Sequence, residues 1–439
     1  MERDELERLS KAELIELVLR MQRPEKTSRT SSKPPSTDRK ERRERSRPGG
    51  AKPGHEGRSR PLSDDVSETV AHYPEACPCC RIALSPDLPA EEVGVHERIE
   101  LPEVKPVVVR HRRMAVRCPG CGARAVAPPA AGTPFGHRLR RSHGVMSAKA
   151  DRRLHAVATY PKTYQALSYE RLQAALLDLF GLAISQGGLM DLLRRAQRRF
   201  ESGREEAVVA LRRAEVVASD ETGVRIEGSN AYHWVFGCER AVVHHAAPTR
   251  AASVVREMMG GHTPEVWLSD RYSAQQGHAA TQQTCLAHPA RDVAYAVEAS
   301  DDPVPFRLKP WLASTFEVAE SAACLAASTL AAKRRALERR LTDILAAPTS
   351  CDLARNLQAK LRRARDQLPT CADRPGEVAA TNNACERDLR PSVIQRKVTN
   401  GYRAMWAAKG EADIRTVVAT ARLTPGTGIF GAVLQTVTP

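Results

Sequence analysis

The stretch Ala214-Glu-Val-Val-Ala-Ser-Asp-Glu-Thr222 decides the fold of this chain. Its first six residues are mostly apolar or small and show no helical period, so they predict a buried β-strand that ends at Asp220. A second run of the same kind, Glu265-Val-Trp-Leu-Ser269, is followed directly by Asp270. We therefore expect one sheet in which two buried strands each carry an Asp at their end.

Further strands are predicted between these two runs. Residues 231–237 and 241–245 are rich in Val, His and aromatic residues, and Gly228-Ser-Asn230 supplies a turn before the first of them. A helix is expected over 252–259, and residues 280–375 are expected to be helical almost throughout. Two antiparallel hairpins, a helix and another strand are the order of a ribonuclease-H-like sheet. The predicted fold class is multidomain α/β plus α, with a mixed sheet.

Three carboxylates stand at positions suited to metal-ion chemistry. Asp220 and Asp270 follow strands, and strand ends on neighbouring strands converge at one edge of a sheet. Glu386 lies in a predicted helix that is crowded with the cations Arg387, Arg390, Arg396 and Lys397. Carboxylate oxygens suit two Mg²⁺ or Mn²⁺ ions, which cleave phosphodiesters, and the cations would hold the DNA backbone. The alternative is that both Asp residues are ordinary loop residues and Glu386 an ordinary surface residue.

Upstream, the cysteines form two knuckles. Cys77-Pro-Cys-Cys80 and Cys118-Pro-Gly-Cys121 are separated by 37 residues, and four thiolates suit one structural Zn²⁺ ion in a ribbon. The predicted ligands are Cys77, Cys80, Cys118 and Cys121, with Cys79 as a spare of unknown role. The chain has 11 cysteines, an odd number that argues against a disulfide framework. The alternative is that these are unliganded turn cysteines.

Residues 150–212 have a helix-turn-helix outline. Ser168 caps a helix that stops at Gly181, and Ser185 caps a second helix over 186–200. The second helix ends in cations predicted to contact DNA: Arg194, Arg195 and Arg198. The alternative is a structural helical hairpin with an exposed basic face.

The N-terminal part of the chain is polar and basic. Residues 1–22 predict a short helix with a capping box of Ser10 and Glu13, which either self-associates or docks on the rest of the chain. Residues 21–60 hold 13 Lys and Arg against 5 Asp and Glu, amid Ser, Pro and Gly. Such a segment is either a flexible DNA-binding arm or a solvated linker.

The overall charge points to the same partner. Lys and Arg number 67 and Asp and Glu 52, so the net charge is +15. This surplus favours a nucleic-acid partner over the alternative of a solvated Arg-rich surface. The aromatic fraction of 4% disfavours an all-β sandwich or an aromatic-rich sugar-binding protein. No apolar run approaches the roughly 18 residues of a membrane span, and the charged N-terminus lacks a signal segment, so we expect a cytoplasmic protein with no membrane partner.

Several motifs in order resemble the insertion-sequence 66 family of DDE transposases. They are Ser31-Ser-Lys-Pro-Pro-Ser-Thr-Asp38, Gly49-Gly-Ala-Lys-Pro-Gly-His55, the two knuckles, Phe180-Gly-Leu-Ala-Ile-Ser185, Asp220-Glu-Thr222, Leu268-Ser-Asp-Arg-Tyr272, Cys285-Leu-Ala-His288 with Arg291, and Asn382-Asn-Ala-Cys-Glu-Arg-Asp-Leu-Arg-Pro391 with Arg396-Lys397. The chain departs from the family at Thr381, where Asp usually precedes the paired Asn, and its N-terminal coiled-coil region is short.

The resemblance implies a catalytic triad of Asp220, Asp270 and Glu386, with a helical insertion between the last two. It implies metal-dependent cleavage at the ends of an insertion sequence, followed by joining of the 3′ ends to target DNA. Partners would be DNA, further copies of the chain on DNA, and accessory proteins of the same element. A binding-only protein with an inactive core, or a related metal-dependent nuclease, stays open as an alternative.

The predicted organisation follows from these motifs. It comprises a short helix (1–22), a basic arm (23–69), a zinc ribbon (70–130), a helical DNA-binding region (137–212), a catalytic domain (213–400) with a helical insertion at about 300–375, and a C-terminal segment (401–439). Cys285 and His288 are interpreted as structural or substrate-side residues, because two ligands alone do not make a metal site. Glu221 is a candidate supporting carboxylate of unknown orientation.

Overall fold

The computed structural model describes most of the chain, namely residues 10–21, 23–27, 29–31, 56, 60–109, 112, 114–128 and 152–438. The chain divides into two compact units, residues 1–38 with 106–439, and residues 39–105. Most of the basic arm expected over 23–69 lies outside the described residues, as does the stretch 129–151. No helix in the described part of the chain is long and apolar enough to cross a membrane.

Near the N-terminus, helix α2 spans Lys11–Met21. The backbone N–H of Ser10 donates to Glu13 Oε2 at 2.7 Å, and the N–H of Glu13 donates to Ser10 Oγ at 3.3 Å. These reciprocal hydrogen bonds satisfy two donors that the helix itself leaves free. Hydrogen bonds from the Ser10 hydroxyl and from its backbone N–H lower the pKa of Glu13. The predicted capping box is confirmed.

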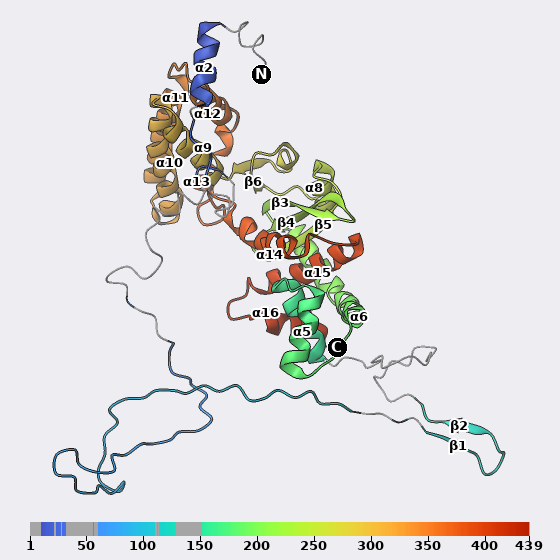
Figure 1. Ribbon diagram of the computed structural model, residues 1–439. Coiled ribbons are helices and arrows are strands. Elements are labelled where there is room, and N and C mark those ends of the chain that lie inside the picture. The colour runs from blue at the N-terminus through green and yellow to red at the C-terminus, as the bar shows by residue number, and fades with distance from the viewer. Residues whose placement is uncertain are drawn as a thin grey trace. The chain divides into compact units, whose positions relative to one another are not determined.

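A mixed five-stranded sheet occupies the centre of the chain, with strand order β5-β4-β3-β6-β7 (Figure 1). Its strands are β3 (Val216–Ile226), β4 (Ser229–Gly237), β5 (Val242–Ala247), β6 (Val266–Ser269) and β7 (Thr281–Thr284). Strands β3, β4 and β5 pair antiparallel, whereas β6 pairs with β3, and β7 with β6, in parallel. The predicted α/β class with a mixed sheet is confirmed.

Strand β3 is longer than predicted. We expected it to end at Asp220, but it continues to Ile226, and Asp220 lies opposite Val235 of β4. Glu227 and Gly228 both take positive φ values, +54° and +76°, and close a two-residue hairpin turn, so the ladder with β4 runs on to that turn. The expectation of a strand-end Asp220 is therefore wrong: only the parallel pairing with β6 stops nearby.

Strand β7 was missed because residues 280–375 were expected to be almost all helical. Its sequence, Thr-Gln-Gln-Thr, lacks the apolar alternation that marks a strand. Tertiary contacts bury it instead, since Gln283 Oε1 accepts the N–H of Cys371 at 2.7 Å and Thr284 Oγ1 donates to Gln367 Oε1 at 2.8 Å. Side-chain hydrogen bonds thus stabilise a polar strand at the sheet edge.

Helices cover both faces of the sheet. Helices α7 (Glu201–Leu211) and α8 (Ala252–Met259) pack with Val217, Trp234 and Trp267 in one buried cluster. On the other face, α14 (Asn383–Thr399) and α15 (Met405–Ala421) pack against Val235, Val242 and the end of the β3–β4 hairpin. Because side chains alternate along a strand, neighbouring residues of β3 point to opposite layers.

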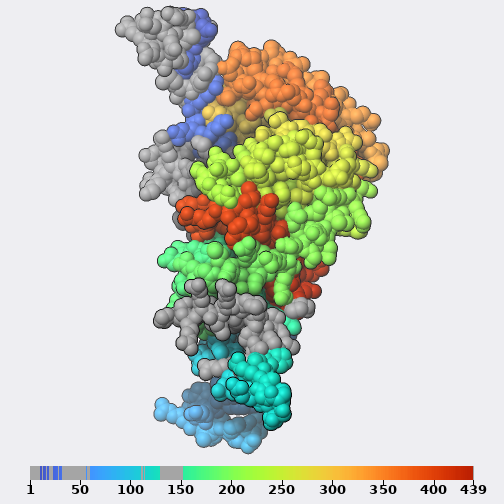
Figure 2. Space-filling view, turned by 90° about the vertical axis from the view of Figure 1, so that its right-hand side faces the viewer, coloured from blue at the N-terminus to red at the C-terminus, as the bar shows by residue number. Residues whose placement is uncertain are grey.

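The helical insertion lies between β7 and α14. It consists of α9 (Ala287–Ala299), α10 (Pro303–Ser321), α11 (Ala327–Ala346), α12 (Asp352–Arg363) and α13 (Thr370–Asp373), with short 3-10 turns at Ala322–Cys324 and Arg365–Gln367. One cluster that includes Leu308, Trp311 and Leu361 joins these helices to the sheet residue Val266. Figure 2 shows the later helices of this group, in orange, gathered beside the yellow-green sheet region.

The region before the sheet is helical, as expected. It contains α4 (Arg152–Thr159), a π-helical turn (Tyr160–Tyr164), α5 (Tyr169–Phe180) and α6 (Gln186–Gln197), with α16 (Ile429–Val437) packed against α4. Ser168 Oγ accepts the N–H of Arg171 and Ser185 Oγ accepts the N–H of Gly188, at 3.2 and 3.1 Å. Gly181 ends α5 with φ +63°. The predicted caps and stop are confirmed.

Candidate active site

The parallel strands of the sheet bring two of the predicted carboxylates to one edge. The parallel register ends with Ala218 of β3 beside Leu268 of β6, and Asp220 and Asp270 each lie two residues further along the chain. Asp270 Oδ1 accepts the backbone N–H of Tyr272 at 2.8 Å, which fixes the loop that follows β6. Neighbouring parallel strands end at a common edge, which is where open α/β sheets place their ligands.

Glu386 comes to the same edge from the first turn of α14. The residue before this helix, Asn382, is buried and donates from Nδ2 to the carbonyl of Ser219 at 2.8 Å. Its backbone N–H donates to Cys285 Sγ at 3.2 Å. Asn382 therefore ties the start of α14 to β3 and to the end of β7, which sets the position of Glu386.

Asp220 has a strongly perturbed carboxyl group. Burial, the neighbouring Glu221, and the charges of Asp270 and Glu386 together raise the pKa of Asp220 to about 8, against a lowering hydrogen bond from the Glu221 amide. Like charges close together disfavour one another's ionised form. The three predicted catalytic carboxylates therefore share one electrostatic environment that a bound cation would relieve.

The three carboxylates do not form the tightest cluster. Within the described residues, Cys285, His288 and Glu386 are the group of three metal-ligating side chains whose ligand atoms all lie within 4.8 Å of one another. Asp220 and Asp270 are outside this group. The structure thus brings Asp220, Asp270 and Glu386 to one edge, with a spread wider than the coordination shell of a single ion.

Glu221 faces the opposite layer of the sheet from Asp220. It follows Asp220 in the strand and therefore points to the opposite layer, where its side chain is 1% exposed. It forms an ion pair with Arg250 and accepts a hydrogen bond from Gln275 Nε2. Burial nevertheless raises its pKa. Glu221 is thus a structural carboxylate beneath the site, which answers the orientation that the sequence left open.

Arg250 links this buried pair to the Asp270 loop. Its guanidinium lies 3.7 Å from the ring centroid of Tyr272, whose hydroxyl donates to the Arg250 carbonyl at 3.2 Å. The same Tyr272 supplies the N–H that Asp270 accepts. Sequence analysis missed Arg250, because nothing in its local sequence marks it and only the fold brings it to Glu221.

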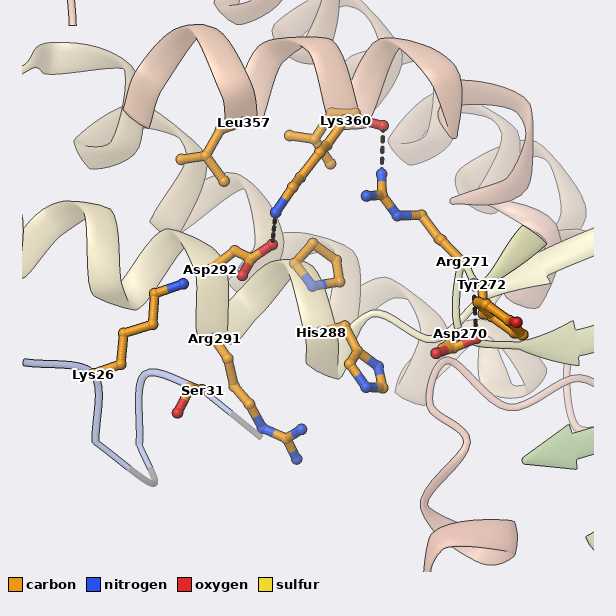
Figure 3. Close-up of a pocket in the computed structure, with 12 residues that line it drawn as sticks. Lys26, Ser31, Asp270, Arg271, Tyr272, His288, Arg291, Asp292, Leu357 and Lys360 are labelled. Atoms are coloured by element: carbon orange, nitrogen blue, oxygen red, sulfur yellow. Dashed lines mark hydrogen bonds and ion pairs between the residues drawn. The ribbon is translucent and has the colours of Figure 1, made fainter. Parts of the chain in front are cut away.

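A pocket of about 400 Å³ opens beside Asp270. Figure 3 shows His288 and Arg291 from α9 lying between Asp270 and the segment that carries Lys26 and Ser31. Arg291 Nη2 lies 3.8 Å from Glu386 Oε2. On another wall of the pocket, Lys360 Nζ forms an ion pair with Asp292 Oδ2 at 2.7 Å, so these two charges compensate each other.

The cations predicted around Glu386 differ in their surroundings. Arg387, Arg390 and Lys397 are exposed on α14. Arg396 is half-buried and donates to Thr222 Oγ1 at 2.8 Å and to the Gly223 carbonyl, so it also fastens α14 to β3. The three exposed cations can bind phosphates without giving up a structural contact.

The arginines of α6 are exposed at its C-terminal end. Arg194, Arg195 and Arg198 all face solvent, while Leu192, Leu193 and Ala196 of the same helix are buried. The Arg194 guanidinium lies 4.9 Å from the ring centroid of Trp406. The helix is thus amphipathic with a basic outer face.

The two cysteine knuckles have the same backbone geometry. In each, the first Cys donates to the carbonyl five residues on and accepts from the amide four residues on, at 2.8–2.9 Å. The residue after each knuckle has a positive φ, +59° at Arg81 and +73° at Gly122. The flanking pairs correspond as well: Ala76 bridges Ala83, and strand β1 (Ala115–Arg117) pairs with β2 (Arg124–Val126).

This correspondence separates Cys79 from the other cysteines. Cys77 matches Cys118 and Cys80 matches Cys121, so Cys79 takes the position of Gly120. In both knuckles, hydrogen bonds from the amides two and three residues on lower the pKa of the first Cys. Amides directed at sulfur favour the thiolate, which is the form that binds metal.

Two family models match the chain. Residues 148–410, more than half of the chain, match the model described as "Transposase IS66 family". Residues 74–122, which hold both knuckles, match the model described as "zinc-finger binding domain of transposase IS66". A search of curated proteins finds no match.

Proposed function

Because the chain belongs to the IS66 family of transposases, we propose that it cuts DNA at the ends of an insertion sequence and joins the 3′ ends to target DNA. The observations that support this proposal are the parallel pairing of β3 with β6, which ends two residues before Asp220 and Asp270, and the charges of Asp270 and Glu386 that act on Asp220. The strand order β5-β4-β3-β6-β7 supports a ribonuclease-H-like catalytic core.

Asp220, Asp270 and Glu386 are the proposed catalytic residues. Their oxygens fit hard divalent cations, and burial together with the neighbouring carboxylates raises the pKa of Asp220, a cost that a bound cation would offset. Two Mg²⁺ or Mn²⁺ ions bound there would activate the attacking oxygen, first of water and then of a DNA 3′-hydroxyl, and stabilise the leaving oxygen. Asp220, Asp270 and Glu386 are spread more widely than the ligands of a single ion, so their arrangement suits two ions better than one.

The chain's own residues would bind and orient the DNA. The exposed Arg387, Arg390 and Lys397 stand on the helix that carries Glu386, so phosphates bound to them lie beside the catalytic edge. Tyr272 and Arg250 hold the Asp270 loop, and Asn382 holds α14. These contacts fix the carboxylates before DNA arrives, which lowers the reorganisation that the reaction needs.

The knuckles and α6 would supply further DNA contacts. Cys77, Cys80, Cys118 and Cys121 are the proposed ligands of one structural Zn²⁺, because their knuckles share one backbone geometry. Arg194, Arg195 and Arg198 form the proposed basic face of a DNA-binding helical region. We also propose that several copies of the chain assemble on DNA, and that accessory proteins of the same element are partners.

A strand-transfer assay tests this function. Full-length protein, Mg²⁺ and DNA carrying the element ends should give both nicked and joined products, and Asp270→Asn should give neither while still binding DNA. Nicks without joined products would favour the alternative of a related nuclease. Binding without either product, in the wild type, would favour a DNA-binding protein with an inactive core.

A further inference from the structure

The segment from Cys285 to His288 shares two features with the cysteine knuckles, namely amides directed at the first sulfur and a second ligand three residues on. In both knuckles the sulfur of the first Cys receives the amides two and three residues on. The sulfur of Cys285 likewise receives the amides of Ala287 and His288, and in addition that of Asn382 at 3.2 Å. The residue three positions on, which is the second Cys of a knuckle, is here His288.

A third ligand comes from a distant part of the sequence. Glu386 reaches the segment from α14, and its oxygen, the sulfur of Cys285 and a ring nitrogen of His288 all lie within 4.8 Å of one another. Sequence alone offered only two ligands at this point. The fold supplies the third, because Asn382 ties the start of α14 to Cys285.

We propose that Cys285, His288 and Glu386 form a binding site for Zn²⁺, separate from the proposed zinc ribbon. Thiolate and imidazole ligands select Zn²⁺ over Mg²⁺. A tetrahedral zinc site has ligand atoms about 3.3–3.8 Å apart, so the side chains need to close by about 1 Å. Three protein ligands leave the fourth position open.

The backbone around Cys285 is held on both sides. The amide of Cys285 donates to the Ser269 carbonyl and the amide of Leu286 donates to the Ala380 carbonyl, both at 2.9 Å. Cys285 is fully buried, so its sulfur has little freedom to move. The closing movement therefore falls to the half-buried side chains of His288 and Glu386.

His288 also offers a ring nitrogen for the ion. Its Nδ1 is buried and has no hydrogen-bond partner, whereas buried polar atoms are nearly always satisfied. Arg291 lies one turn further along α9, but its 3.8 Å distance to Glu386 exceeds a hydrogen bond. Arg291 is therefore only a weak competitor of a divalent cation for the Glu386 carboxylate.

The site shares Glu386 with the proposed catalytic triad, so its consequence rests on the proposed function. A carboxylate bound to Zn²⁺ beside Cys285 is drawn away from Asp220 and Asp270. Zn²⁺ would then inhibit Mg²⁺-dependent cleavage by taking one catalytic ligand.

Metal counting tests the site without any activity measurement. Full-length protein is dialysed against Zn²⁺, freed of loose metal, and its zinc per chain is measured for the wild type, Cys285→Ser and the control Cys371→Ser, which changes another buried cysteine. We expect Cys285→Ser to hold one zinc fewer than the wild type and Cys371→Ser to hold the same number. Equal zinc in Cys285→Ser and the wild type would overturn the proposal.

A second variant guards against misfolding of the first. If Cys285→Ser loses its far-ultraviolet circular dichroism, zinc per chain is measured for His288→Asn instead, because this variant leaves the buried sulfur in place. His288→Asn should also hold one zinc fewer than the wild type. With Co²⁺ instead of Zn²⁺, the wild-type spectrum minus that of His288→Asn should show a band of one thiolate bound to cobalt. A featureless difference spectrum would count against the site.

The inhibitory consequence is tested separately. Zn²⁺ added to the Mg²⁺ cleavage assay should inhibit the wild type at concentrations at least about 10-fold lower than those that inhibit Cys285→Ser, because loss of a direct ligand weakens binding at least as much as loss of an outer-shell partner. Equal inhibition of both would refute competition for Glu386. If no protein cleaves DNA, the proposed function fails, while the metal count still decides whether the zinc site exists.

Discussion

The knuckle region and the sheet region both gather metal-ligating side chains, but by different means. Around the knuckles almost every residue is exposed: strands β1 and β2 are exposed throughout, and Val107 is 92% exposed. In the sheet, Trp234 and Trp267 are completely buried. Local hydrogen bonds shape each knuckle, whereas packing of distant segments shapes the sheet edge that carries the proposed catalytic carboxylates.

This difference has an energetic consequence. Burial of apolar surface supplies most of the free energy of folding, and the knuckle region has little of it. We therefore expect a bound ion to be the main source of order there. The sheet region gains its stability from its core and can hold unfavourable features, such as the carboxyl of Asp220 and the buried Glu221.

Removal of zinc should give the largest effect and separate the two regions. A chelator, or Cys118→Ser, should make residues 60–128 sensitive to protease while 152–438 stay resistant, because zinc contributes about 10–16 kcal/mol to the folding of small zinc-binding peptides. Limited proteolysis with mass spectrometry measures this. Cys79→Ser is the matched control and should leave protection unchanged. Metal-free wild type with a protected knuckle region would contradict the comparison.

Asp220→Asn should weaken function and strengthen the fold. Cleavage should fall at least about 1,000-fold, or about 4 kcal/mol. The pKa of about 8 means that folded Asp220 holds its proton more tightly than the unfolded residue, so ionisation costs stability as pH rises from 4 towards 8. The isosteric amide removes that cost.

Thermal unfolding without divalent metal measures the second half of this prediction. The melting temperature of Asp220→Asn should exceed that of the wild type by roughly 2–5 °C at pH 8. The gain should shrink towards pH 4. A lower melting temperature than the wild type at pH 8 would show that Asp220 is stabilised by contacts rather than strained.

Arg250→Met should destabilise the sheet region by about 2–3 kcal/mol, because it leaves the buried Glu221 unpaired. This is less than the roughly 3–5 kcal/mol of a fully buried broken pair, since Arg250 itself is 37% exposed. Urea unfolding measures the change. The double variant Arg250→Met/Glu221→Gln should recover most of the loss. Failure to recover it would mean that Arg250 acts through Tyr272 and not through the charge pair.

Acid should produce the smallest effect, through a histidine pair in the core. His233 Nε2 and His244 Nδ1 lie 3.1 Å apart, and burial lowers the pKa of both, that of His244 to about 3. The folded state therefore binds protons more weakly than the unfolded chain, so stability present above pH 6.5 is lost as pH falls. The loss should be about 1 kcal/mol per pH unit.

His244→Gln provides the comparison for this acid effect. The variant keeps a polar side chain of similar reach but has no proton to gain, so its stability should fall less steeply between pH 6.5 and 5. Denaturant unfolding at several pH values measures the slopes. Identical slopes for both proteins would place the acid sensitivity elsewhere.

Much of the secondary structure could be predicted from local sequence patterns. The strand before Asp270, the helix at 252–259, the caps at Ser168 and Ser185 and the capping box of α2 depend on neighbouring residues, so short stretches of sequence were sufficient. The family match likewise agrees with the motifs quoted in order along the chain. The catalytic and zinc ligands stay predictions.

Features that depend on distant partners were missed. Strand β7 has no apolar pattern and exists because Cys371 and Gln367 hydrogen-bond to it. The role of Arg250 and the anchoring of α14 by Asn382 depend on residues far away in the chain. Long-range hydrogen bonds leave no periodic trace in either of the segments that they join.

The amino-acid sequence by itself determined the family, the two knuckles and the buried strand before Asp270, because these features depend on residue type and spacing. Only the tertiary structure decided that Asp220 and Glu221 point to opposite layers, and that Glu386 approaches Cys285 and His288. The physical reason is that strand register and helix packing are set by burial across the whole core, a quantity that no short stretch contains.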